Sequence, residues 1–350
     1  MQGTVDSDMW ADVPIPPEFE ETELERRGKS FDMGAPVTGA VAVGDRVAVG
    51  FGDGKVRFFE GDKPPVSVGA HKGVILCLVA NGSDVLTGGE DGRFLRVSPD
   101  GTVEEIANFG SKWVDCVTAA EGLYACSSGR TVHVWSGGKA VKSLEHESTV
   151  GGLAVNVEQK SLAVSHYGGV TLWNYKADKW TSSKLEWKGS HGEVNFSPDG
   201  KFIVTAMQEM AVHVWRMLDR GDLEMSGYPT KVKSFAWVGD KPHLATSGAS
   251  EAICWPFDGE NGPMRRSPIC VSHRGEKRVT VVQDLPGEEA LFVGFHDGAV
   301  LLAELLVDSD ALILRRPNDA EVTAMAVTES RSHIFIGDAS GQVLWSSLYA

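Results

Sequence analysis

The sequence predicts an all-β protein that folds as a single β-propeller of four-stranded blades. Three observations support this prediction. One alternating hairpin motif recurs about every forty residues, the chain contains 40 glycines and 10 tryptophans, and no long amphipathic helix interrupts the strands. Many tight turns and a recurring large side chain are typical of repeated β structure.

The recurring motif is clearest where "TVHVW" at Thr131 returns as "AVHVW" at Ala211, with "VTLW" at Val170 between them. In each case a β-branched run, a turn rich in Gly, Asp or Ser and a short alternating strand follow one another. Eight such segments begin at Val47, Asp84, Leu123, Leu162, Phe202, Leu244, Leu291 and Ile334. The position that holds Trp in five of them recurs at spacings of 38, 38, 38, 42, 40, 48 and 42 residues.

Each hairpin is flanked by further candidate strands, such as "VTGAVAV" from Val37 ahead of the first hairpin and "KAVKSL" from Lys139 after the third. A period-two strand cannot bury its apolar face alone, so the units must pack on one another. Four strands per unit in a closed ring predict eight blades. Seven is the alternative, if one of the weaker units, the first or the seventh, has another role.

The ring is expected to close through its N-terminal strand. The last hairpin ends near Trp345 with no outer strand after it, whereas "SFDMGAPVTGAVAV" from Ser30 aligns with "SLEHESTVGGLAV" from Ser143, where an outer strand leads into the next unit. We therefore expect residues 30–32 to pair with the C-terminal blade, which would remove exposed sheet edges. The predicted domains are an arm over residues 1–29 and a propeller over residues 30–350.

The arm is acidic and contains prolines, with eight acidic and three basic residues in positions 1–29. This composition favours a flexible or loosely docked segment. Two interpretations remain open. Trp10, Ile15 and Phe19 could engage a groove on this protein or on another, or the arm could be a solvated tail.

"VNFSPDGKFIVTA" from Val194 resembles the inner strand, turn and second strand of a WD40 repeat, with Pro198 and Gly200 placed for a type I turn. The "VHVW" and "VTLW" segments resemble the third strand of that repeat. On these motifs the chain is similar to the WD40-repeat family over residues 30–350, although no repeat ends in Trp-Asp. The resemblance implies a rigid platform for assembling proteins.

The family often braces a blade with a hydrogen-bonded set of His, Ser or Thr, Asp and Trp. Partial sets are His146, Ser165 and Trp173 in one unit, His71, Thr87 and Asp91 in another, and the fragments His273 and Asp297. We expect these residues to satisfy buried polar groups and not to carry out chemistry.

Charge and motif content exclude several classes of function. A net charge of -15 disfavours binding to nucleic acid or anionic membranes, and no signal-peptide pattern or long apolar stretch is present. The five cysteines show no metal-ligand spacing, which favours reduced thiols in a cytoplasmic protein. No motif for a catalytic, cofactor or metal site is found.

We therefore expect a non-enzymatic scaffold or adaptor that is a monomer on its own. The alternatives are a propeller hydrolase or lyase with a central-channel site and a structural subunit of a larger obligate complex.

The candidate partner-binding residues flank the first turn of each inner strand and should share one face of the ring. They are Trp113, Asp115, His191, Lys231, Lys233, Lys277 and Arg278, with Glu321 beside them. Four basic side chains from two neighbouring blades predict attraction to an acidic segment of a protein or peptide, with Trp113 as an apolar anchor. The arm itself could cover these basic residues. The alternative is that the cations are solvated and that Trp113 caps the core.

Overall fold

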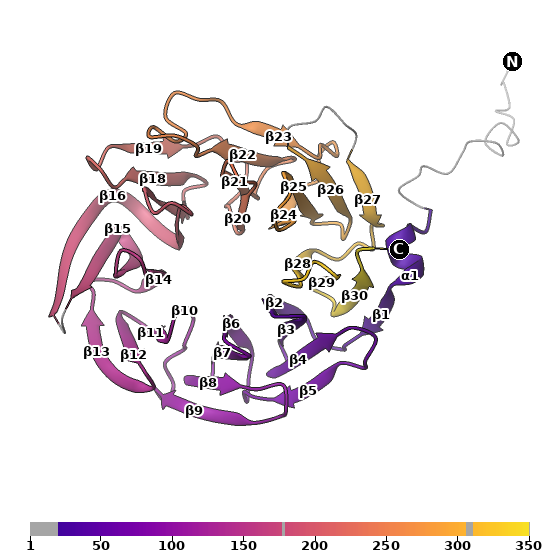
Figure 1. The fold of residues 1–350 in the computed structure, drawn as a ribbon, viewed down its shortest axis with the longest axis horizontal. Helices are drawn as coiled ribbons and strands as arrows, with labels where there is room; N and C mark the ends of the chain where they lie inside the picture. The colour runs from indigo at the N-terminus through magenta and orange to yellow at the C-terminus, as the bar shows by residue number, and fades with distance from the viewer. Residues whose placement is uncertain (1–19, 177–178, 306–310, 350) are drawn as a thin grey trace, which may run out of the picture.

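In the computed structural model, which describes residues 20–176, 179–305 and 311–349, antiparallel sheets are arranged radially around a common centre (Figure 1). The all-β propeller predicted from the sequence is confirmed. Within a blade the chain passes from the innermost strand outward, and a connection then leads to the innermost strand of the next blade.

The first three sheets each have four strands in sequence order. Their strands are β2 (Val37–Val43), β3 (Arg46–Phe51), β4 (Lys55–Glu60), β5 (Val66–Gly69), β6 (Ile75–Asn81), β7 (Asp84–Gly89), β8 (Arg93–Val97), β9 (Val103–Asn108), β10 (Val117–Ala120), β11 (Leu123–Ser128), β12 (Thr131–Ser136) and β13 (Lys139–Glu145). The next sheet contains β14 (Val150–Asn156), β15 (Ser161–Lys176), β16 (Lys179–Phe196), β17 (Phe202–Met207), β18 (Val212–Arg216) and β19 (Asp222–Met225).

The remaining sheets again have four strands each. They are formed by β20 (Phe235–Val238), β21 (His243–Thr246), β22 (Ala252–Pro256), β23 (Ile269–Val271), β24 (Val279–Asp284), β25 (Ala290–Phe295), β26 (Val300–Glu304), β27 (Leu312–Arg315), β28 (Val322–Val327), β29 (His333–Asp338), β30 (Gln342–Ser347) and β1 (Lys29–Asp32).

The six-stranded sheet spans two of the predicted repeat units. The long strand β15 bends at Gly168, which has a φ of 91°. Its two halves lie side by side, and a hydrogen bond from the Tyr175 N–H to the Lys160 carbonyl joins their ends. Strand β16 pairs with β15 as far as Ser190 and with β17 from His191 onward. The ring therefore has seven sheets, the alternative number expected from the sequence, because two of the eight repeat units share one sheet.

The ring closes as predicted. Strand β1 pairs antiparallel with β30, from Lys29 opposite Trp345 to Asp32 opposite Gln342. Strand β1 thereby supplies the outer strand of the sheet that also holds β28 and β29 (Figure 1). Both ends of the propeller thus complete one sheet, and the edge of β30 is covered.

A short helix, α1 (Glu23–Arg27), precedes β1 and was not predicted from the sequence. Thr22 caps it in a capping box with Glu25, and its only buried residue, Leu24, is 2% exposed. Leu24 packs in an apolar cluster with residues of β27 and β30. The described part of the predicted arm is therefore docked on the propeller, whereas Trp10, Ile15 and Phe19 lie outside the described residues.

The core lies between neighbouring blades. Second strands such as β3, β25 and β29 are almost entirely buried, since both of their faces pack against protein. Across the closure, the ring of Phe59 lies 5.1 Å from that of Phe335 and 5.8 Å from that of Trp345. Such contacts explain why a single forty-residue unit is incomplete without its neighbours.

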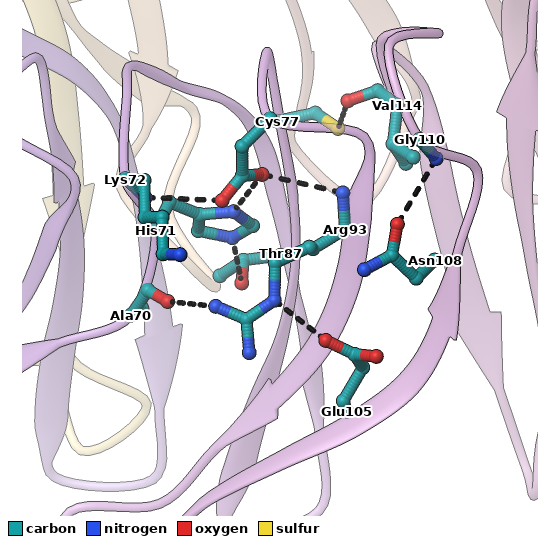
Figure 2. Close-up of polar contacts among 11 residues, drawn as sticks. Ala70, His71, Lys72, Cys77, Thr87, Arg93, Glu105, Asn108, Gly110 and Val114 are labelled. Carbon is teal, nitrogen blue, oxygen red and sulfur yellow. Dashed lines mark hydrogen bonds and ion pairs between the residues drawn. The ribbon is translucent and has the colours of Figure 1, made fainter.

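The second blade contains the brace expected from the sequence (Figure 2). His71 joins Thr87 Oγ1 through Nε2 at 2.9 Å and the Asp91 carboxylate through Nδ1 at 2.8 Å. Burial lowers the pKa of His71, although Asp91 acts in the opposite direction. For Asp91, burial alone would raise the pKa, but hydrogen bonds from the Lys72 amide, His71 and the Arg93 amide outweigh it and lower the pKa.

The corresponding brace in the unit of His146 is formed in part. The Trp173 indole N–H donates to His146 Nε2 at 3.1 Å. Ser165 does not join this pair, because its hydroxyl donates to the carbonyl of Gly192 in the neighbouring unit.

Other blades replace the histidine. In the sheet of β20 to β23, Tyr228 OH contacts Thr246 Oγ1 at 2.8 Å and accepts from the Trp255 indole at 2.9 Å. In the sheet of β24 to β27, the Asp297 carboxylate accepts from Arg274 at 3.0 Å. His273, expected as a fragment of this brace, instead pairs with Glu251 at 3.0 Å and is exposed.

Candidate partner-binding face

Two kinds of connection lie at the same end of every blade, because the strands alternate in direction. One leads from the outer strand of a blade to the inner strand of the next, and the other joins the second and third strands within a blade. We call this end of the ring the loop face. Such loops carry freely variable side chains on strands that hold their positions.

Three of the predicted basic residues meet in one pocket on the loop face. The pocket has a volume of about 230 Å³ and is lined by Thr230, Lys231, Lys233, Ser247, Arg278, Val279, Thr280, His296 and Glu321. Lys231 and Lys233 come from the connection before β20, and Arg278 comes from the connection before β24. We call this site the basic pocket.

The backbone brings these connections together. Gly248 accepts from the Thr230 N–H through its carbonyl at 3.2 Å, and its own N–H donates to the Val279 carbonyl at 3.0 Å. Gly248 has a φ of 100°, and a Cβ there would lie only 3.1 Å from the Thr230 carbonyl oxygen. Any residue with a side chain would be strained at this φ and would crowd the Thr230 carbonyl, so glycine suits this close approach. It fixes the Lys231 loop against the loop of Arg278.

The cations of the basic pocket differ in their pairing. Lys233 Nζ lies 3.2 Å from Glu321 Oε1, and both side chains are partly exposed. The Arg278 backbone N–H donates to His296 Nδ1 at 3.0 Å, which leaves the proton of a neutral imidazole on Nε2. Within residues 20–176, 179–305 and 311–349, the side chains of Lys231 and Arg278 make no ion pair. The pocket thus holds three cations against one carboxylate.

The structure separates the other predicted residues from this pocket. Lys277 points instead to Asp297, with 3.5 Å between Nζ and Oδ2. Trp113 is 57% exposed in the connection between β9 and β10. His191 was wrongly placed on the surface by the sequence analysis, since it is 1% exposed and joins Thr205 Oγ1 at 2.7 Å inside its blade.

Asp115 lines a different hollow, of about 560 Å³, between the inner strands β6, β10, β14 and β16. It accepts from the Ser127 hydroxyl at 2.9 Å, and burial raises the pKa of Asp115. Glu193 reaches the same hollow, where desolvation by the surrounding protein raises the pKa of Glu193. No group of three or more His, Cys, Asp or Glu side chains is placed to hold a metal ion among the residues that the structure describes.

Two exposed apolar side chains on the loop face were missed by the sequence analysis. Tyr167, in the bend of β15, is 68% exposed, and Met210, between β17 and β18, is 48% exposed. Both occupy the turn between the second and third strands of a unit. An aromatic residue beside two glycines in "HYGG" was the available signal for Tyr167, because a glycine turn has no need of a large side chain.

Together, the radial blades, the N-terminal closing strand and the loop face define a β-propeller, the fold that solved WD40 domains also have. No family model matches the sequence, and no curated protein matches it either. In the part of the chain that the structure describes, no helix is long and apolar enough to span a membrane.

Solved structures share this fold at low sequence identity. The designed protein Ika8 is 15% identical with a TM-score of 0.73, and the match covers 91% of this chain and 98% of that one. The WD40 β-propeller domain of Doa1 is 14% identical with a TM-score of 0.61, covering 92% and 96%. The C-terminal WD40 domain of Sif2 is 12% identical with a TM-score of 0.74, covering 93% and 99%.

Proposed function

We propose that this protein is a non-enzymatic cytoplasmic scaffold that binds a protein or peptide partner on its loop face. The partner contributes an acidic segment that enters the basic pocket. One observation carries the proposal: Lys231, Lys233 and Arg278 come from two connections and converge on one pocket, although the chain has a net charge of -15.

The basic pocket favours encounter and orientation. An exposed ion pair contributes about 0.2–1 kcal/mol, so three cations alone give modest affinity. Complementary charge instead speeds association and selects acidic partners. The Lys231 and Arg278 side chains make no ion pair within the described parts of the chain. A carboxylate of the partner can therefore reach them without displacing a carboxylate of this chain.

The apolar side chains on the loop face provide contact area beyond the pocket. Trp113, Tyr167 and Met210 come from three successive units, and each is about half exposed or more. Large aromatic residues dominate the energetics of many protein interfaces, since they bury much area with few rotatable bonds. We therefore place the acidic part of the partner at the basic pocket and its apolar part on these three residues.

The test is recovery of partners from the native lysate by a tagged chain, quantified by mass spectrometry. The variant Lys231→Glu/Arg278→Glu should recover at least about tenfold less partner than the parent. This ratio corresponds to a loss of about 1.4 kcal/mol in binding free energy. Lys139→Glu/Lys142→Glu on the outer strand β13 changes the charge equally and should recover the partner as the parent does. Both variants should keep the melting temperature of the parent.

Equal recovery by the two double variants would refute the role of the basic pocket. Comigration of the whole cellular pool at high mass, unchanged in both variants, would favour the structural-subunit alternative.

A further inference from the structure

We propose that the chain's own acidic N-terminal segment, residues 1–19, occupies the basic pocket when no partner is bound. This inference rests on the proposed function, because it concerns regulation of the same site. The segment would compete with the partner for the basic pocket.

Charge complementarity supports this occupant. Residues 1–19 contain four acidic residues, Asp6, Asp8, Asp12 and Glu18, and no Lys or Arg. The basic pocket presents three cations and one carboxylate, two of the cations without an ion pair in the described part of the chain. On a protein of net charge -15, an acidic segment is repelled by most of the surface and attracted to such a pocket.

The segment is tethered next to the pocket. Helix α1 holds the chain at Thr22, whose hydroxyl donates to the Leu314 carbonyl at 2.6 Å, and Glu25 pairs with Arg316 at 2.9 Å. Arg316 begins the connection that ends at Glu321, which lines the basic pocket. Residues 316–321 span at most about 20 Å even when fully extended. Arg316, which holds helix α1, and Glu321, which lines the basic pocket, are therefore the two ends of one short connection.

The length of the segment suits this distance. Nineteen residues provide enough chain to cross a span of about 20 Å, since an extended chain covers up to about 3.3–3.6 Å per residue. A linker whose length matches its span gives a local concentration in the millimolar range. With an intrinsic dissociation constant near 100 μM, the segment would weaken the apparent affinity of a competing acidic ligand about tenfold.

The experiment uses a fluorescent peptide of residues 1–19 as the probe, measured by anisotropy. One receptor is the full chain, and the other is the full chain with Asp6→Asn, Asp8→Asn, Asp12→Asn and Glu18→Gln. The neutralised chain should bind the peptide about tenfold more tightly than the parent, and the binding should weaken as salt rises. Adding Lys231→Glu/Arg278→Glu should abolish binding, whereas adding Lys139→Glu/Lys142→Glu should not change it.

Equal affinity of the parent and the neutralised chain would overturn the proposal, as would binding that survives Lys231→Glu/Arg278→Glu. The two proposals fail separately. If partner recovery depends on Lys231 and Arg278 but the peptide does not bind the neutralised chain, the partner site stands and the self-masking is wrong.

Discussion

Replacing Leu24 by alanine tests whether helix α1 stabilises the closed ring. Leu24 is 2% exposed and packs among Leu314 and Leu344, and its carbonyl accepts from the Ser346 hydroxyl at 3.0 Å. A Leu→Ala change at such a site costs about 2–5 kcal/mol. For a 350-residue chain, the entropy of unfolding is about 0.7 kcal/mol per kelvin. The melting temperature should therefore fall by about 3–7 °C.

The assay is differential scanning calorimetry at neutral pH, with Leu218→Ala as the matched control. Leu218 is 86% exposed, so its truncation should leave the melting temperature within about 1 °C of the parent. If Leu24→Ala behaves like Leu218→Ala, helix α1 does not contribute to the stability of the ring, and the docked arrangement described above is refuted.

Two further predictions concern Gly151 on the inner strand β14 and the buried His213. Gly151→Ala should lower the free energy of unfolding by about 1–3 kcal/mol, because a Cβ there collides with the His191 carbonyl oxygen. Chemical denaturation measures this loss. Gly69→Ala is the neutral control, since no atom lies within 4 Å of its new Cβ. His213 is fully buried and burial lowers its pKa to about 3, so the folded state keeps it neutral while the unfolded state takes up a proton below about pH 6.5. Its contribution to stability is complete above pH 6.5 and is lost as the pH falls toward 3, by up to about 1.4 kcal/mol per pH unit. His213→Phe should make the fall in urea midpoint between pH 7 and 5 shallower, and an identical pH dependence in parent and variant would contradict this account.

Much of the fold could be predicted because a propeller repeats its local pattern. Every unit must bury its apolar strand faces against its neighbours, so the same period-two alternation recurs about every forty residues. These repeats indicate a ring even though no contacts are known from the sequence. The closing strand was predictable for the same reason, since the residues from Ser30 align with an outer strand elsewhere. The sheet count was less accessible, because continuity of β15 and β16 depends on backbone geometry at their bends.

The candidate site was predictable only where position within the repeat decides exposure. Lys231, Lys233 and Arg278 occupy equivalent connections, and the structure places them together. His191 occupies a similar position, but a histidine there can turn inward to meet Thr205, and sequence alone does not distinguish the two orientations. Arg replaces His in two braces, since Arg315 also pairs with Asp338, at 2.6 Å, in the last blade. The signal that was missed is that Arg274 and Asp297 have the same spacing in the sequence as Arg315 and Asp338.

The antiparallel pairing of β1 with β30 also sets how the ring responds to tension. Lys29 lies opposite Trp345, so a pull on residues before β1 and after β30 acts on the same end of both strands. Such a load would first separate helix α1 from the apolar cluster in which Leu24 packs. It would then break the hydrogen bonds between β1 and β30 one residue pair after another. The join that completes the circle is thus the place where stretching from the two ends would first open the ring.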